Sequence, residues 1–136
     1  MRGKQITFPT TEYPHLYDRV VPADHFLRRV KNAVDFSFIY EEVADYYPSR
    51  LGRPPVDPKR LFGYLFLKDH YGLSDEEVVE RSRYDMSFKY FLDLLPEEDI
   101  INPSTLSRFR TMRFRDEEHI RELLEKVADS VAEAEA

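Results

Sequence analysis

The sequence predicts an all-α fold, a compact bundle of about six helices that includes a helix-turn-helix-like unit. Apolar residues recur at helical spacing in one segment after another, and residues that favour helix starts precede those segments. No stretch of useful length shows the alternation that marks a strand. The chain of 136 residues carries 9 tyrosines and 10 phenylalanines, and such large rings supply enough apolar area for one core.

The N-terminal part of the sequence is predicted to form an irregular arm followed by two helices. Residues 1–21 contain prolines and no sustained period, so we expect an irregular arm there. Apolar residues at helical spacing predict a helix over 25–34, with Asp24 as its N-cap. A second helix is expected over 36–46, before Pro48.

The middle of the sequence is predicted to form a central helix. Asp57 and Pro58 form an N-cap followed by a proline in the first helical turn, and Gly72 is placed to end the helix. Between them the segment is apolar on most sides, as is typical of a buried helix. The capping-box pattern from Ser74 to Glu77 then starts a helix over 75–83.

Three further helices complete the predicted bundle. A short helix is expected over 87–94, a helix capped by Asn102 and Pro103 over 103–114, and an acidic helix over 116–136. The predicted domain organisation is an irregular arm (1–21), a helical DNA-binding domain (22–115) and an acidic C-terminal helix (116–136). Within the domain, the helices at 75–83, 87–94 and 103–114 form the candidate helix-turn-helix-like unit.

The charge distribution indicates where an anionic partner would bind. The formal net charge is −6, and residues 116–136 alone hold eight carboxylates and two bases. Residues 1–115 are therefore neutral, and within them residues 100–115 hold four arginines and no acid. A local patch of this kind can contact phosphates even when the whole protein is acidic.

The helix at 103–114 carries the candidate DNA contacts. At 100° per residue, one face gathers small hydroxyl side chains and arginines, while Leu106 and Phe109 project from the other side. Arginine can bond guanine with two donors, and Ser and Thr can contact bases or phosphates. The candidate DNA-binding residues on this face are Ser104, Ser107, Arg108, Thr111 and Arg115.

Two more arginines, Arg110 and Arg113, are included among the candidates but lie nearer the apolar edge of the helix. Two roles are open for them, because they are placed either to clamp phosphates or to pair with carboxylates of the domain. The alternative for the helix as a whole is an ordinary amphipathic helix with a solvated polar face.

The composition excludes several other kinds of site. There is no cysteine, so disulfides, thiolate zinc sites and cysteine nucleophiles are excluded. The four histidines are scattered singly, so we expect no metal site, and no pattern indicates a cofactor or a catalytic group. No signal peptide or membrane-spanning stretch is apparent, so we expect no membrane partner and a cytoplasmic, nucleoid-associated protein.

The last helix has an apolar stripe of heptad-like spacing. Two interpretations are open, since this stripe would either dock on the chain's own core or mediate self-association. The candidate partner is then a second copy or a longer form of the same protein, contacted through Ile120, Leu124, Val127 and Val131.

Several motifs in fixed order resemble the N-terminal domain of insertion-sequence transposases of the InsH type. These are Asp35–Ile39, Gly52–Pro55 with Asp57-Pro58, Tyr71–Asp75 with Glu77, Phe88 with Tyr90–Leu92, and Pro103–Arg110. The resemblance covers roughly residues 20–130, and the order and spacing of the motifs make it specific.

The resemblance implies a helical domain that recognises the ends of a mobile element, its terminal inverted repeats, as double-stranded DNA. In that family the domain precedes an RNase-H-like catalytic domain with an Asp-Asp-Glu triad, which these 136 residues do not include. We therefore expect DNA binding and no enzymatic activity from this chain. The alternative is a protein-interaction or dimerisation module, for example a truncated transposase that inhibits the full-length protein.

Overall fold

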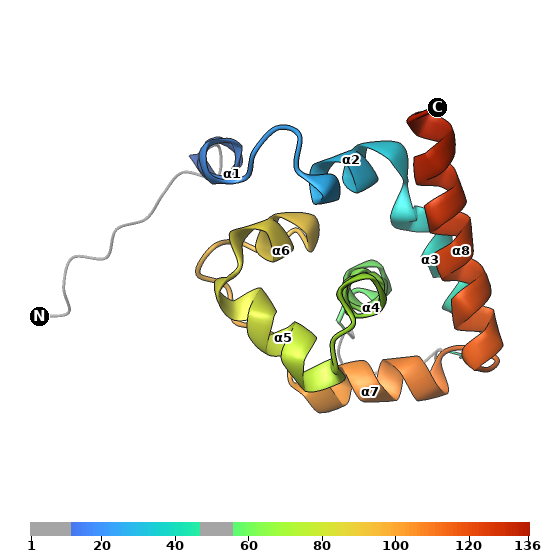
Figure 1. Cartoon of the computed structure of the whole chain (residues 1–136). Coiled ribbons are helices and arrows are strands. Elements are labelled where there is room, and N and C mark those ends of the chain that lie inside the picture. The colour runs from blue at the N-terminus through green and yellow to red at the C-terminus, as the bar shows by residue number, and fades with distance from the viewer. Residues whose placement is uncertain (1–11, 47–55) are drawn as a thin grey trace, which may run out of the picture.

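The computed structural model describes residues 12–46 and 56–136, and these residues form helices and connecting turns with no strand (Figure 1). The α-helices are α1 (Glu12–Val20), α2 (Phe26–Ala33), α3 (Ile39–Val43), α4 (Pro58–Tyr71), α5 (Asp75–Tyr84), α6 (Met86–Phe91), α7 (Pro103–Met112) and α8 (Glu117–Ala134). Two 3-10 helices, η1 (Phe36–Phe38) and η2 (Ala44–Tyr46), flank α3. The predicted all-α class is confirmed.

Helix α4 is the centre of the bundle, as its apolar composition predicts. Asp57 caps it by accepting a hydrogen bond from the backbone N–H of Lys59, and Gly72 ends it in the left-handed conformation, with φ of 65°. Every residue from Leu61 to Leu67 is buried. Figure 1 looks down this helix, and α2, α5, α6, α7 and α8 are arranged around it. The elements that surround α4 therefore share one core.

The N-terminal prediction is wrong in part. The segment expected to be an irregular arm contains α1, from Glu12 to Val20, and Tyr17 of this helix is buried and donates a hydrogen bond to the carbonyl of Leu94. Arg28 of α2 donates to the carbonyls of Tyr17, Val21 and Pro22 and so caps the end of α1. Tyr17 and Leu94 are 77 positions apart, and Arg28 lies outside the segment, so periodicity within the segment does not reveal these contacts.

Two other helices differ from their predicted forms. The segment 36–46 is split into η1, α3 and η2, because Asp35 caps a 3-10 turn that buries Phe36 before α3 begins. Helix α2 is capped by His25 rather than by Asp24, since the His25 ring accepts the hydrogen bond from the backbone N–H of Leu27. With α1 added, the described residues hold eight α-helices rather than about six.

Helix α6 ends earlier than predicted, at Phe91, and Asp93 adopts a left-handed conformation with φ of 59°. The chain turns there so that Leu92 and Leu94 are both buried. Burial of these two leucines stabilises the turn in place of a further helical turn.

Helix α8 packs against the chain's own core. Its apolar stripe is buried at Ile120, Leu123, Val127 and Val131, whereas Leu124 is half-buried. Of the two interpretations of this stripe, docking on the core is therefore what the structure shows. Self-association through Ile120, Leu124, Val127 and Val131 stays a prediction, but three of these four residues are already covered within the chain.

Candidate nucleic-acid interface

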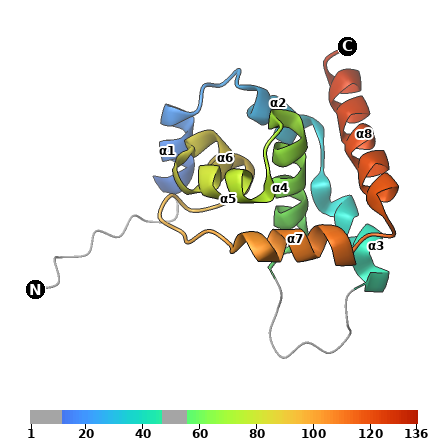
Figure 2. The same cartoon turned by 60° about the horizontal axis from the view of Figure 1, so that its bottom comes forward.

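The start of α7 is fixed by its own sequence. The Asn102 side chain accepts a hydrogen bond of 2.8 Å from the backbone N–H of Ser104, and Pro103 occupies the first helical turn. Leu106 and Phe109 are buried, and they hold one side of the helix on the core. Figure 2 shows α7 crossing at the end of α4, along the lower edge of the molecule. The opposite side of α7 faces solvent as predicted.

The solvent side of α7 holds four of the five predicted contact residues. Ser104, Arg108 and Thr111 are exposed, and Ser107 is half-buried. The hydroxyls of Ser104 and Thr111 make local hydrogen bonds, to the Asn102 side chain and to the carbonyl of Ser107. The side chain of Arg108 has neither a hydrogen-bond partner nor an ion pair among the residues that the structure describes. Its donors are therefore available to a ligand.

Arg110 is held by carboxylates of the domain. Its Nη2 atom donates to Asp75 Oδ2 at 2.7 Å, and its Nη1 atom lies 3.5 Å from Glu117 Oε1. The hydrogen bond to Asp75 raises the pKa of Arg110 above its ordinary value, so the guanidinium stays charged. Because Asp75 is the first residue of α5, this ion pair ties α7 to the start of α5. Of the two roles open for Arg110, pairing with carboxylates is the one observed.

Arg113 lies at the end of α7 and is also engaged. Its Nη1 atom donates to the carbonyl of Tyr46 at 2.8 Å. The helix stops at Met112 so that Phe114 can turn into the core, where its ring meets that of Phe109 edge-on at 5.1 Å between centroids. If α7 continued through residue 114, Phe114 would lie on the same side of the helix as half-exposed Ser107, next to solvent. Burial of the Phe114 ring therefore favours an α7 that ends at Met112.

The early end of α7 moves Arg115 off the helix, and its predicted place on the same helical face as Arg108 is wrong. Its half-exposed side chain lies 3.5 Å from Asp116 Oδ2 and 3.5 Å from Glu122 Oε1. Exposed ion pairs of this length contribute little free energy. Arg115 is thus loosely held by the start of α8 and can exchange these carboxylates for another anion.

The turn between α7 and α8 is fixed by a pair that the sequence did not reveal. His119 Nδ1 accepts a hydrogen bond from the backbone N–H of Arg115, so the proton of the neutral ring lies on Nε2, 3.0 Å from Glu42 Oε1. The carboxyl of Asp116 caps α8, and the hydrogen bond from the backbone N–H of His119 lowers its pKa. Glu42 and His119 are 77 positions apart, and no local pattern indicates such a contact.

Helices α5, α6 and α7 lie together on one side of α4 but do not have the spacing of a simple helix-turn-helix. The connection between α6 and α7 runs from residue 92 to residue 102, whereas that motif uses a turn of about 3–4 residues. Of the basic residues near this unit, Arg81 is paired with Asp85 at 2.9 Å and Arg83 with Glu80 at 3.3 Å. Lys89 is buried, and burial lowers its pKa.

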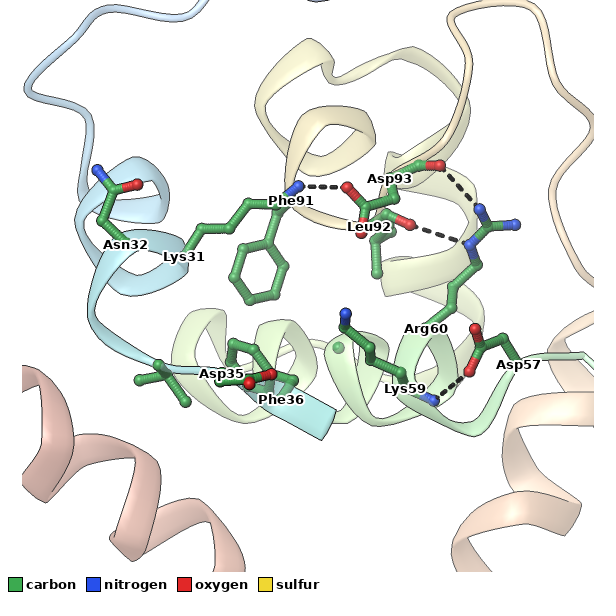
Figure 3. Close-up of a pocket in the computed structure, with 12 residues that line it drawn as sticks. Lys31, Asn32, Asp35, Phe36, Asp57, Lys59, Arg60, Phe91, Leu92 and Asp93 are labelled. Carbon is green, nitrogen blue, oxygen red and sulfur yellow. Dashed lines mark hydrogen bonds and ion pairs between the residues drawn. The ribbon is translucent and has the colours of Figure 1, made fainter. Parts of the chain in front are cut away.

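A cavity of about 390 Å³ lies apart from the α7 face, between the end of α2, η1, the start of α4 and the end of α6 (Figure 3). A methyl group on Gly63 would lie 3.0 Å from the Leu92 side chain, so this glycine lets the end of α6 approach α4 closely. Lys31 is paired with Asp93, and the Lys59 ammonium points into the cavity. Three cationic and three carboxylate side chains line the walls: Lys31, Lys59, Arg60, Asp35, Asp57 and Asp93. This balance does not favour a polyanion.

In the described ranges, no three histidine, aspartate or glutamate side chains gather in a way that would hold a metal ion. Within the same ranges, no helix combines the length and the apolar character needed to cross a bilayer.

A known protein family matches most of the described helical bundle. The model of the family described as "Transposase domain (DUF772)" matches residues 15–112. The chain belongs to this transposase domain family. The match runs from within α1 to the last residue of α7, so it includes Arg108 and its neighbours and stops before Arg115 and α8. Neither a curated protein nor a solved structure gives a significant match to the chain.

Proposed function

We propose that this transposase domain is the DNA-binding N-terminal domain of an InsH-type insertion-sequence transposase, and that it recognises the ends of its element in the cytoplasmic nucleoid. The observation that carries the proposal is the solvent face of α7. Arg108 is exposed and its donors bond no other residue in the part of the chain that the structure describes, and Ser104 and Thr111 are exposed on the same face. The family match supports a role of this kind in transposition.

In this proposal α7 acts as the recognition helix of a helix-turn-helix-like unit in which α5 and α6 support it. Asn102 and Pro103 fix the start of α7, and the Arg110–Asp75 ion pair fixes its end against α5. A rigid helix delivers Arg108 in one orientation, which direct contact with a base edge requires. Ser104 and Thr111 then contact bases or phosphates on either side of Arg108, and Ser107 lies at the edge of the surface.

Arg115 is assigned a different part of the same contact. It lies beyond the end of α7 and is held only by exposed ion pairs, so it is suited to a phosphate rather than a base. Arg113 and Arg110 support the surface from behind because their guanidinium groups already bond the carbonyl of Tyr46 and the carboxylate of Asp75.

In this proposal the 136 residues supply no groups for the cleavage or joining of DNA strands. The proposal is therefore that this chain binds element ends and does not itself cut DNA.

The test is fluorescence anisotropy with labelled duplexes from the two ends of the encoding element and with scrambled duplexes of equal length, at several salt concentrations. We expect tighter binding to the end duplexes and an affinity that falls steeply with salt, because each phosphate contact releases counterions. Equal, salt-independent affinity for all duplexes would contradict the proposal.

A further inference from the structure

A groove with a mixed polar and apolar lining runs between the C-terminal half of α4 and the first turns of α8. It consists of two hollows of about 290 and 420 Å³, and Asp69, Glu117, Ile120 and Leu124 line both. Its apolar lining comes from Leu65, Leu73, Ile120 and Leu124, and charged side chains lie beside them: Lys68, Asp69, Arg110 and Glu117. The groove therefore continues from the α4–α5 turn along the side of α8.

The α8 wall of this groove is only partly covered by the chain. Leu124 belongs to the apolar stripe of α8 but is half-buried, unlike Ile120 and Val127 on either side of it. Ala128, one turn further along, is exposed and lines the same groove. A small alanine beside a leucine allows the backbone of another helix to approach closely while the leucine fills a pocket.

The charges at the groove limit what can occupy it. Arg121 and Glu125 lie on α8 and Lys68 and Asp69 on α4, so both signs are present on both walls. The contact of Arg121 with Glu118, 3.2 Å long, joins two side chains that are more than half exposed, and it is easily exchanged. A strongly acidic or strongly basic partner would leave like charges facing each other, whereas a surface of mixed charge would not.

We propose that this groove is occupied by α8 of a second copy of the chain, in an antiparallel, two-fold symmetric pair. Arg121 and Glu125 are one helical turn apart on either side of Leu124. A two-fold axis at the level of residue 123 places Arg121 of each chain opposite Glu125 of the second copy. Leu124 of each chain then enters the groove of the other, and the contact is self-complementary as two-fold symmetry requires.

This interface differs from the apolar seam that the heptad-like spacing predicts. Ile120, Val127 and Val131 serve the core of their own chain, and the dimer contact shifts round α8 to Arg121, Leu124, Glu125 and Ala128. It uses neither Arg108 nor the rest of the solvent face of α7. Dimerisation through this groove is therefore independent of DNA binding, and a variant can lose either one without the other.

The experiment is sedimentation equilibrium of the whole chain over a range of concentrations. We expect the native protein to form a dimer reversibly. Arg121→Glu should raise the dimer dissociation constant about tenfold or more, because it sets two carboxylates against each other twice in each dimer. The exchange variant, Arg121→Glu with Glu125→Arg, should restore dimerisation because the pairing is re-formed with its signs reversed.

The matched control is Lys126→Glu, which makes the same change of charge on an exposed residue of α8 outside the groove, where Lys126 lies over the ring of Phe38. It should dimerise as the native chain does. A native chain that is monomeric at all concentrations would overturn the inference. Equal weakening by Arg121→Glu and Lys126→Glu, or an exchange variant no better than Arg121→Glu, would overturn it too.

Discussion

The two sides of α7 use the same residue type for opposite purposes. Arg108 and Arg110 are two positions apart, yet Arg108 is exposed without a partner in the described structure, and Arg110 is bonded to Asp75 at 2.7 Å. The first is available to a ligand, and the second stabilises the helix that carries the first. The comparison shows that an arginine-rich segment does not by itself indicate a binding surface. The guanidinium donors of some of its arginines can already be bonded to other groups of the same domain.

The same comparison extends to the other two arginines of the segment. Arg113 donates to the carbonyl of Tyr46, and Arg115 is shared between two exposed carboxylates of α8. The local excess of four positive charges therefore becomes one uncommitted arginine and one loosely held arginine. Variants of these residues should separate loss of stability from loss of DNA binding.

The largest effect is expected on the buried side of α7. Phe109→Ala removes a ring that is 3% exposed and packs edge-on against Phe114, so the free energy of unfolding should fall by about 3–5 kcal/mol. Thermal and urea denaturation, followed by circular dichroism, measure this. A variant as stable as the native chain would show that this side of α7 does not anchor it.

A smaller loss of stability is expected from Arg110→Ala. The change leaves Asp75, whose side chain is 16% exposed, without its closest hydrogen-bond donor, and we expect a loss of about 1–3 kcal/mol. Arg108→Ala is the matched control and should unfold within about 0.5 kcal/mol of the native chain, because its side chain contacts no described partner. Equal stability of the two variants would remove the distinction between the two arginines.

The smallest effect is expected at the start of α8, where a carboxylate competes with DNA for Arg115. Glu122→Gln should tighten DNA binding about two- to fivefold, since the exposed ion pair that must open is worth less than about 1 kcal/mol. Glu118→Gln, which removes the same charge from a residue paired with Arg121, is the control.

Anisotropy titrations of both glutamine variants, alone and combined with Arg115→Ala, test this competition. The gain from Glu122→Gln should exceed that from Glu118→Gln and should disappear when Arg115 is absent. A gain that persists without Arg115 would reflect only the less negative net charge of the protein.

Much of the fold could be predicted because its helix ends are determined locally. Asp57, Gly72 and Asn102 each act within a few residues of the helix end that they cap, so sequence patterns identify them. The buried sides of α4 and α7 follow from the spacing of their apolar residues. These are contacts between near neighbours in the chain.

The remaining features depend on contacts between distant residues. Helix α1 is held by Arg28 and by the Tyr17–Leu94 hydrogen bond, and nothing in its own sequence indicates that it packs on the domain. Arg115 lies outside the exposed face of α7 because the ring of Phe114 is buried in the core, which ends the helix earlier. The partner of Arg110, Asp75, lies 35 positions away in the sequence. The sequence thus identified the helix of the candidate site but not which of its arginines were already engaged.

The central claim, that Arg108 is the uncommitted arginine that α7 presents to DNA, is tested most directly by Arg108→Ala. Its matched control is Arg29→Ala, which changes a half-exposed arginine of α2, and Figures 1 and 2 place this helix on the side of the molecule away from α7. Anisotropy against element-end duplexes should show about 1–3 kcal/mol weaker binding for Arg108→Ala and almost none for Arg29→Ala, with both proteins as stable as the native chain. Unchanged affinity of a folded Arg108→Ala variant, or equal losses for the two variants, would contradict the claim.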